Sequence, residues 1–385
     1  MLLLIKLEGD TLKEKTKNIR ESNFELLRIT SMILIILYHI IHHGNTINNS
    51  TNESIKIILT IIRYITLVHV NSFIILTGYF QSTSKFKISK VVKLISQILF
   101  YTISIYIIAI KLGLIKNYNY LDILNCISIS AIGEYWFITN YLILYIFSDY
   151  INKFINAITK KQIENFIIIT FVIFSLIPII SGGKILNNDG FNFYNFIYLY
   201  IIGAYLKLYP IKENYYFKRL SKQKYRILLI FIFILCVYLN YSLILFSDKI
   251  NNTNLLFTQI ASKIYKYTLA YSNPFTIIQT ICYFELFKSI NIKNKLINYL
   301  SKYTFGVYLI HDSNIARNNI YKILKIDRTF SSYKMIPYIF FITILIFILC
   351  TFIEILRAKL FDIIINLTKK TKIHKNNTKN IKLIS

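Results

Sequence analysis

Charged residues, cysteine and proline are all scarce in this chain. Only 16% of the 385 residues are charged, whereas a soluble domain of this size carries roughly 25%. This deficit indicates that much of the folded surface faces something other than water. The four cysteines, Cys126, Cys236, Cys282 and Cys350, form no C-x-x-C pair and none lies beside a histidine. The cysteines therefore predict no disulfide framework, no metal site and no thiol nucleophile.

Long apolar runs fill most of the sequence instead. Hydrophobic residues make up 55% of the chain, and its mean hydropathy is +0.50. About ten runs approach the length of roughly 20 residues that a membrane-spanning helix needs. We therefore expect an all-α fold, a polytopic membrane helix bundle of about ten transmembrane helices. The runs cover residues 25–43, 57–80, 91–112, 134–150, 163–182, 190–209, 226–246, 271–288, 297–315 and 334–356.

Basic residues greatly outnumber acidic ones, and their distribution predicts the orientation of the chain. The formal net charge is +27, which raises nucleic acid as a partner, but no nucleic-acid-binding motif is present. Loops on one side of the predicted bundle carry more than twice as many Lys and Arg residues as those on the other. Cytoplasmic loops collect such residues, so the sequence predicts a multi-pass protein of the plasma membrane with both termini inside the cell.

Three segments follow from this reading. Residues 1–24 are expected to form a cytoplasmic N-terminal segment, residues 25–357 the transmembrane domain and residues 358–385 a basic cytoplasmic tail. From Lys369 the tail is basic and rich in asparagine, so we expect it to be disordered.

The first predicted span carries two polar residues in places where they are costly. Arg28 and His39 are eleven residues apart, close to three helical turns, so both lie on one face about 16 Å apart along the axis. In the predicted orientation, Arg28 lies near the cytoplasmic surface and His39 toward the outer side. Titratable residues inside a span are candidates for function. The alternatives are that Arg28 reaches the headgroups or pairs with Glu25, and that His39 is structural.

The second predicted span contains Arg63 and His69. Arg63 lies at a depth similar to that of His39, so we expect both to face a common polar cavity near the outer leaflet. An ion pair of purely structural value is the alternative for Arg63. His69 lies near the midplane, where we expect a hydrogen-bonded packing residue.

Near the other end of the chain, YTFGVYLIHDSN (303–314) brings His311 and Asp312 toward the outer side. A histidine next to a carboxylate can act as an acid/base pair or bind a hydroxyl-rich ligand. The alternative is an ordinary helix end turned outward. Glu354 lies near the inner end of the last span, where pairing with Arg357 is the expected role.

Four segments in this order resemble the acyltransferase-3 family of multi-spanning membrane acyltransferases, over residues 20–357. They are RESNFELLRITSMILIILYHI (20–40), in which Arg28 is followed by ten residues and then His39, NSFIILTGYF (71–80), EYWFITNYLILYIFSDYIN (134–152), and SKYTFGVYLIHD (301–312). Two departures are small. Thr77 stands where the family usually has Ser, and Asp149 where Pro is common.

The resemblance implies a membrane O-acyltransferase that passes an acyl group, typically acetyl, from cytoplasmic acyl-CoA to a sugar hydroxyl of an exported or lipid-linked glycan. It implies a catalytic His39, acting as a general base or as a transient acyl carrier, and a functional Arg28. Acetyl-CoA is a donor substrate in this picture, and no permanently bound cofactor is expected. Trp136, the only tryptophan, joins Arg63, His311 and Asp312 as an expected residue of the substrate cavity.

The implied donor also gives a role to the lysines that follow the second span. Lys85, Lys87, Lys90 and Lys93 are placed to meet the CoA phosphates. Ordinary positive charges of a cytoplasmic loop are the alternative. The oligomeric state stays open.

The competing function is a polysaccharide transporter or flippase without acyl chemistry. Such proteins also need many spans with polar residues inside, and they often show internal repeats and broken helices. The sequence indicates neither feature, and it contains only four prolines.

Overall fold

The computed structural model describes residues 21–116, 119–127, 135–180, 189–250, 255–326 and 328–381. Within these ranges every regular element is a helix, and the one extended pairing is an isolated bridge between Ser50 and Phe330. The predicted all-α class is therefore confirmed. Most of the predicted N-terminal segment 1–24, residues 128–134 ahead of the fourth predicted span and the end of the tail lie outside the described residues.

The helices follow one another with short connections. Their bounds are α2 Ser22–His43, α3 Thr46–Asn49, α4 Glu53–Thr66, α5 Val68–Gln81, α6 Ile88–Lys111, α7 Tyr120–Ile127, α9 Trp136–Ala157, α10 Lys160–Phe171, η1 Val172–Leu176, α11 Ile177–Ile180, α12 Phe193–Leu208, η2 Ile211–Glu213, α13 Tyr215–Lys218, α14 Lys222–Ile250, α15 Leu255–Thr268, α16 Pro274–Ser289, α17 Lys295–Leu300, η3 Ser301–Tyr303, α18 Thr304–His311, α19 Asn314–Ile323 and α20 Met335–Ile381.

Asparagine, serine and threonine begin many of these helices. A side-chain oxygen at the N-cap accepts hydrogen bonds from the first free backbone N–H groups and so fixes where a helix starts. At α16 the cap residue Asn273 is followed by Pro274, which suits the first helical position. The residues that cap in this way are Asn52, Thr159, Asn192, Asn273, Asn294 and Ser313.

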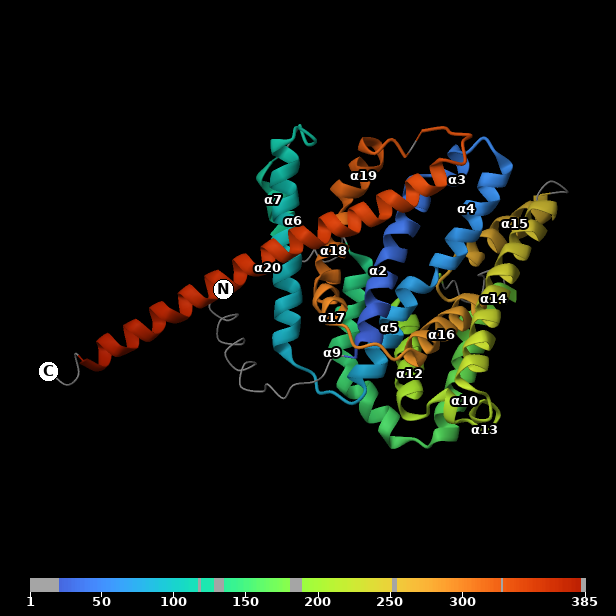
Figure 1. The fold of residues 1–385 in the computed structure, drawn as a ribbon, viewed down its shortest axis with the longest axis horizontal. Coiled ribbons are helices and arrows are strands. Elements are labelled where there is room, and N and C mark those ends of the chain that lie inside the picture. Colours follow the sequence, from blue (N-terminus) through green and yellow to red (C-terminus); the bar gives the residue numbers. More distant parts are fainter. Residues whose placement is uncertain are drawn as a thin grey trace.

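Helix α2 lies in the middle of the bundle (Figure 1). It packs against α4, α5, α16, α17, α18, α19 and α20, and side chains such as Leu27, Ile36 and Ile40 are almost completely buried. Most side chains of α2 therefore face other helices.

Six helical segments of the described chain are long and apolar enough to cross a membrane. They are Ser22–His43, Glu53–Gln81, Ile88–Lys111, Lys160–Ile179, Lys222–Ile250 and Met335–Ile364. Helices also occupy the other predicted spans, but α12 and α16 have only 16 residues each, which is short for a bilayer crossing. The count of ten spans and the orientation of the termini stay predictions.

The second predicted span is not one straight helix. α4 ends at Thr66 and α5 begins at Val68, with Leu67 between them. The backbone N–H of Leu67 donates to the carbonyl of Tyr64, a tighter turn than that of an α-helix. No broken helix was expected from the sequence, and this turn sets the direction of α5.

The contact between α5 and α12 depends on two glycines. A Cβ atom on Gly78 would lie 2.1 Å from the carbonyl oxygen of Tyr200, and one on Gly203 would lie 2.1 Å from the carbonyl oxygen of Ile75. Backbones can approach this closely only where neither helix carries a side chain, as is common in membrane bundles. Gly78 belongs to the TGYF segment that the sequence singled out, and its role here is packing.

A buried carboxylate joins α6, α18 and α20. Glu354 accepts hydrogen bonds from Gln97 Nε2 at 2.9 Å, from the Tyr101 hydroxyl at 2.5 Å and from Arg357 at 2.7 and 2.8 Å. Its side chain lies against Gly306 of α18, where a Cβ atom would overlap it. The predicted pair with Arg357 is confirmed, and the carboxylate is fully engaged in structure.

Helix α20 runs past α2 and continues beyond the bundle (Figure 1). It extends to Ile381, whereas the sequence predicted disorder from Lys369. A helix that is already formed adds each further residue with one more hydrogen bond, so a basic tail can extend the last span.

The glycine contact gives a prediction about stability. We expect Gly78→Ala to lower the midpoint of thermal unfolding in detergent strongly, because its Cβ meets backbone that cannot turn away. The expected loss of stability exceeds the roughly 1–3 kcal/mol typical of overpacking. Gly113→Ala is the matched control. Gly113 has open space around it and a φ of +68°, so only backbone strain of about 1–2 kcal/mol is expected. Equal shifts for both variants would contradict this account.

Candidate active site

A cavity of about 320 Å³ lies beside α2 and is lined mainly by α2, α5, α9 and α18. Arg28 and His39 both line it, and the eleven residues between them correspond to about 16 Å of helix. Met32 and Ile35 of the intervening turns line the same space. The two candidate residues of the first span therefore share one cavity, and the part of its lining between them is apolar.

α18 runs beside α2 in the same direction, and this brings His39 next to Asp312. Near the start of α2, the Ser22 hydroxyl accepts a hydrogen bond from the backbone N–H of Asn294 at 2.9 Å. Near its end, His39 Nδ1 lies 3.3 Å from Asp312 Oδ1. Both side chains are shielded, with exposures of 12% for His39 and 3% for Asp312. A carboxylate beside one ring nitrogen orients the imidazole and selects the tautomer protonated on that nitrogen.

Asp312 is itself held by a cation. Arg317, in the first turn of α19, reaches Oδ1 of Asp312 with its terminal Nη2 at 2.7 Å and its Nε at 3.2 Å. Nη2 also donates to the backbone carbonyl of Asp312 at 3.1 Å. His39, Asp312 and Arg317 thus form a continuous chain of polar contacts.

His311 lies behind this chain, outside the group of residues that line the cavity. Its Nδ1 is 2.7 Å from the carbonyl oxygen of Val307, and its ring centre is 5.3 Å from that of His39. Its Nε2 is buried and has no hydrogen-bond partner among the described residues. The structure brings His311 to His39, as a neighbour in packing.

Aromatic side chains close the same end of the cavity. Trp136 of α9 lies nearly parallel to Tyr271, with ring centres 5.9 Å apart, and both line the cavity. Phe191 packs against Trp136 from outside, at 4.4 Å between ring centres. His69 is completely buried, lies 3.3 Å from the Tyr271 hydroxyl through Nε2 and also lines the cavity. The expected hydrogen-bonded packing of His69 is confirmed.

The opposite end of the cavity is charged. Arg28 Nη1 lies 2.7 Å from Glu25 Oε1, the i,i+3 pair that the sequence offered. Glu25 is 7% exposed whereas Arg28 is 32% exposed, so the guanidinium keeps an open side. Lys302 of η3 lines the cavity here too. Two cations, Arg28 and Lys302, and the carboxylate of Glu25 therefore mark this end.

The four predicted donor-binding lysines lie at the start of α6, outside the cavity lining. Lys85 precedes α6, and Lys87 is the N-cap of that helix. The backbone N–H of Lys87 donates to the Tyr145 hydroxyl at 3.0 Å, and the Lys90 ammonium lies 5.4 Å from the centre of the Tyr145 ring. Lys93 is followed directly by Leu94, which does line the cavity. None of the four lysines lines the cavity. Asp149, which stands where the family commonly has Pro, accepts a hydrogen bond from the backbone N–H of Phe86 at 2.9 Å, just before α6.

Arg63 does not share the cavity with His39. It is buried, with its guanidinium 5.9 Å from the ring centre of Tyr265, and it is absent from the cavity lining. Equal depth in the membrane does not bring two side chains together, because each helix also has a rotation about its axis. Arg63 faces α15 and Tyr265.

Three site residues escaped sequence reasoning. Lys302 lies near the inner end of the apolar run 297–315, Tyr271 is one of 31 tyrosines, and Arg317 follows Asp312 by five residues. Only Arg317 left a usable signal, since an arginine close to a costly carboxylate is a candidate partner. The other two required the fold.

Comparison with known proteins points to one family. Residues 21–355 match the acyltransferase domain of the acyltransferase-3 family, which covers most of the chain. Searches of curated proteins and of solved structures give no match.

The matched range begins just before α2 and ends inside α20, so it includes every helix that lines the cavity. Its apolar helices are those of a membrane protein. The chain belongs to the acyltransferase-3 family, and it is a membrane acyltransferase.

Proposed function

We propose that the chain transfers an acyl group, acetyl by default, from cytoplasmic acyl-CoA to a sugar hydroxyl of a cell-surface or exported polysaccharide. One observation carries this proposal: Arg28 and His39 line the same cavity although about 16 Å of helix separates them. A cation at one end and a histidine–carboxylate pair at the other are what a transfer across part of the plasma membrane needs.

The charged end suits the donor. CoA carries anionic phosphates, and Arg28 and Lys302 present cations at the cavity wall. Lys85, Lys87, Lys90 and Lys93 add positive charge near Leu94, on the side of the bundle where the predicted orientation places the cytoplasm. In this proposal the nucleotide of CoA stays outside the cavity, on the cytoplasmic side. The arm that carries the thioester extends into the cavity along Met32 and Ile35 toward His39.

The aromatic end suits the acceptor. Trp136 and Tyr271 offer flat apolar faces with polar tips, and His69 lies beside them. Side chains of this kind can cover the apolar face of a ligand while bonding its hydroxyls. A sugar that enters here brings a hydroxyl close to His39.

The transfer needs one base and one proton path. With Nδ1 protonated and facing Asp312, Nε2 of His39 is free to take the proton from the acceptor hydroxyl. The hydroxyl oxygen attacks the thioester carbonyl, the new C–O bond forms, and the C–S bond breaks. The CoA thiolate then takes the proton from His39. Asp312 and Arg317 act as positioning residues that hold the imidazole and balance its charge.

An acyl-histidine intermediate is the other route that the same geometry allows. In that route Nε2 attacks the thioester first, and the acceptor hydroxyl takes the acyl group in a second step. Brief mixing of labelled acyl-CoA with protein alone distinguishes the routes, because label stays on the protein only in the second.

Removing the base gives the first test of function. We expect His39→Ala to lower the turnover number by roughly 10²-fold or more, the usual contribution of an acid/base group. The measurement is transfer of radiolabelled acetyl from acetyl-CoA to a surface-glycan fraction by protein in nanodiscs. His42→Ala is the matched control, since His42 is exposed, stacks on Tyr38 and does not line the cavity. Activity that survives in His39→Ala would remove His39 from the chemistry.

Neutralising the cationic end tests the donor site. We expect Arg28→Gln and Lys302→Gln each to raise KM for acyl-CoA about tenfold, because a hydrogen bond to a charged group contributes roughly 1.5 kcal/mol or more. KM for the acceptor should change little. Lys295→Gln, an exposed position on α17 outside the cavity, is the matched control. A larger effect on the acceptor KM than on the donor KM would place the donor elsewhere.

A further inference from the structure

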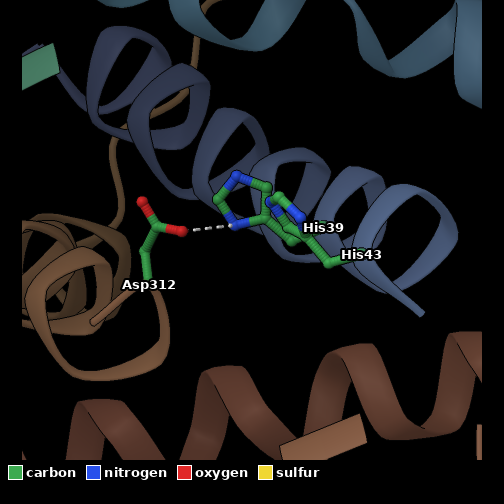
Figure 2. Close-up of side chains that lie close together, drawn as sticks. All are labelled: His39, His43 and Asp312. Atoms are coloured by element: carbon green, nitrogen blue, oxygen red, sulfur yellow. Dashed lines mark ion pairs between the residues drawn. The ribbon is translucent and has the colours of Figure 1, made fainter. Parts of the chain in front are cut away.

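Three side chains that can ligate a metal ion meet at the C-terminal end of α2. His39 and His43 are four residues apart on that helix, and Asp312 faces them from the turn between α18 and α19 (Figure 2). Each offers one ligand atom, and the three atoms lie within 4.8 Å of one another. The cysteines gave no hint of such a site, because it uses none.

The spacing of the two histidines suits one ion. Residues at i and i+4 lie on the same face of a helix, and two histidines so placed are a common chelating pair. Zinc binds imidazole nitrogen and carboxylate oxygen at about 2.0–2.2 Å. Ligand atoms that lie within 4.8 Å of one another therefore need only small rotations to reach one centre.

Acyl transfer does not account for His43. Its side chain is exposed and does not line the cavity, and its ring packs 5.1 Å from that of His39 and 6.4 Å from that of Tyr321. Its ring nitrogen nevertheless lies within 4.8 Å of ligand atoms of His39 and Asp312, the two residues that the proposed chemistry uses. A role that joins His43 to His39 and Asp312 explains this placement.

The surroundings restrict which ion fits. Arg317 already contacts Asp312 Oδ1 at 2.7 Å, and a carboxylate has enough lone pairs to bond an arginine and a metal together. Such outer partners commonly orient metal-binding carboxylates. Mg²⁺ and Ca²⁺ need several oxygen ligands, and this cluster of two histidines and one carboxylate does not suit them. The guanidinium charge opposes any second cation, so the ion must bind imidazole strongly. An ion with strong affinity for imidazole, such as Zn²⁺, Cu²⁺ or Ni²⁺, remains.

We propose that His39, His43 and Asp312 form a binding site for a divalent transition-metal ion, and that the bound ion inhibits acyl transfer. A metal on His39 and Asp312 occupies the base and the carboxylate that orients it, so the histidine can no longer accept a proton. The inhibition rests on the proposed function, whereas the binding does not. Because His43 is exposed, the ion reaches the site from the solvent beyond the end of α2.

Binding is tested first, without reference to activity. Protein in nanodiscs, purified without a histidine tag, is titrated with Co²⁺, whose visible absorption reports coordination by nitrogen and oxygen, and Zn²⁺ is then added as competitor. We expect one ion per chain in the wild type, and His43→Gln to weaken binding roughly tenfold or more, since losing even an outer partner costs 10–100-fold. His42→Gln, the neighbouring exposed histidine outside the cluster, should bind like the wild type.

Inhibition is tested in the same samples. Zn²⁺ should inhibit acetyl transfer by the wild type and His42→Gln at the concentrations that displace Co²⁺, and His43→Gln should keep its basal activity but resist Zn²⁺. Absence of stoichiometric Co²⁺ binding, or equal binding by the two glutamine variants, overturns the site. Binding at this site with undiminished transfer overturns the inhibitory role. If no acyl donor supports transfer at all, the proposed function fails while the Co²⁺ titration still decides the site.

Discussion

The structure depends on the cost of placing polar groups inside a membrane. A titratable side chain in the bilayer interior must face protein and find a partner. Two such residues on α2 have close partners: Arg28 lies 2.7 Å from Glu25, and His39 lies 3.3 Å from Asp312. Asp312 in turn requires Arg317. The Arg28–Glu25 pair lies within α2 itself, whereas the His39–Asp312 contact joins α2 to the turn after α18 and so explains why α18 runs beside α2.

Close contacts between helices fix the position of the helices that line the cavity between Arg28 and His39. Gly78 and Gly203 let α5 and α12 touch backbone to backbone, and the turn at Leu67 directs α5 so that His69 reaches the cavity wall. The Glu354 cluster ties α6 to α20, with its carboxylate packed against Gly306 of α18. The apolar stretch between the charged and aromatic ends is therefore bounded by helices with fixed spacing, as a site for a long, mostly uncharged arm requires.

Much of this was predictable, and the failures have physical causes. Helical periodicity alone placed Arg28 and His39 on one face, and depth placed Asp312, like His39, toward the outer side. The structure places all three at one cavity. The same depth argument did not hold for Arg63, because depth does not fix how a helix is rotated, and Arg63 faces Tyr265. Tyr271 and Lys302 reach the site through loops and a short helix whose paths no periodicity encodes. The lengths of the apolar runs overstate the number of helices that are long enough to cross a membrane, since α12 and α16 have only 16 residues each.

The central claim is that one cavity binds an acyl-CoA with its phosphates at Arg28 and its acyl group at His39. The most direct measurement is a cryo-electron microscopy structure of the protein in nanodiscs, bound to an antibody fragment and to a thioether analogue of acetyl-CoA that cannot transfer its acyl group. The account predicts phosphate density beside Arg28 and Lys302, an extended arm along Met32 and Ile35, and the acyl carbonyl within hydrogen-bond distance of His39. Density for the analogue in any other place, with this cavity filled by lipid or left to solvent, would contradict it.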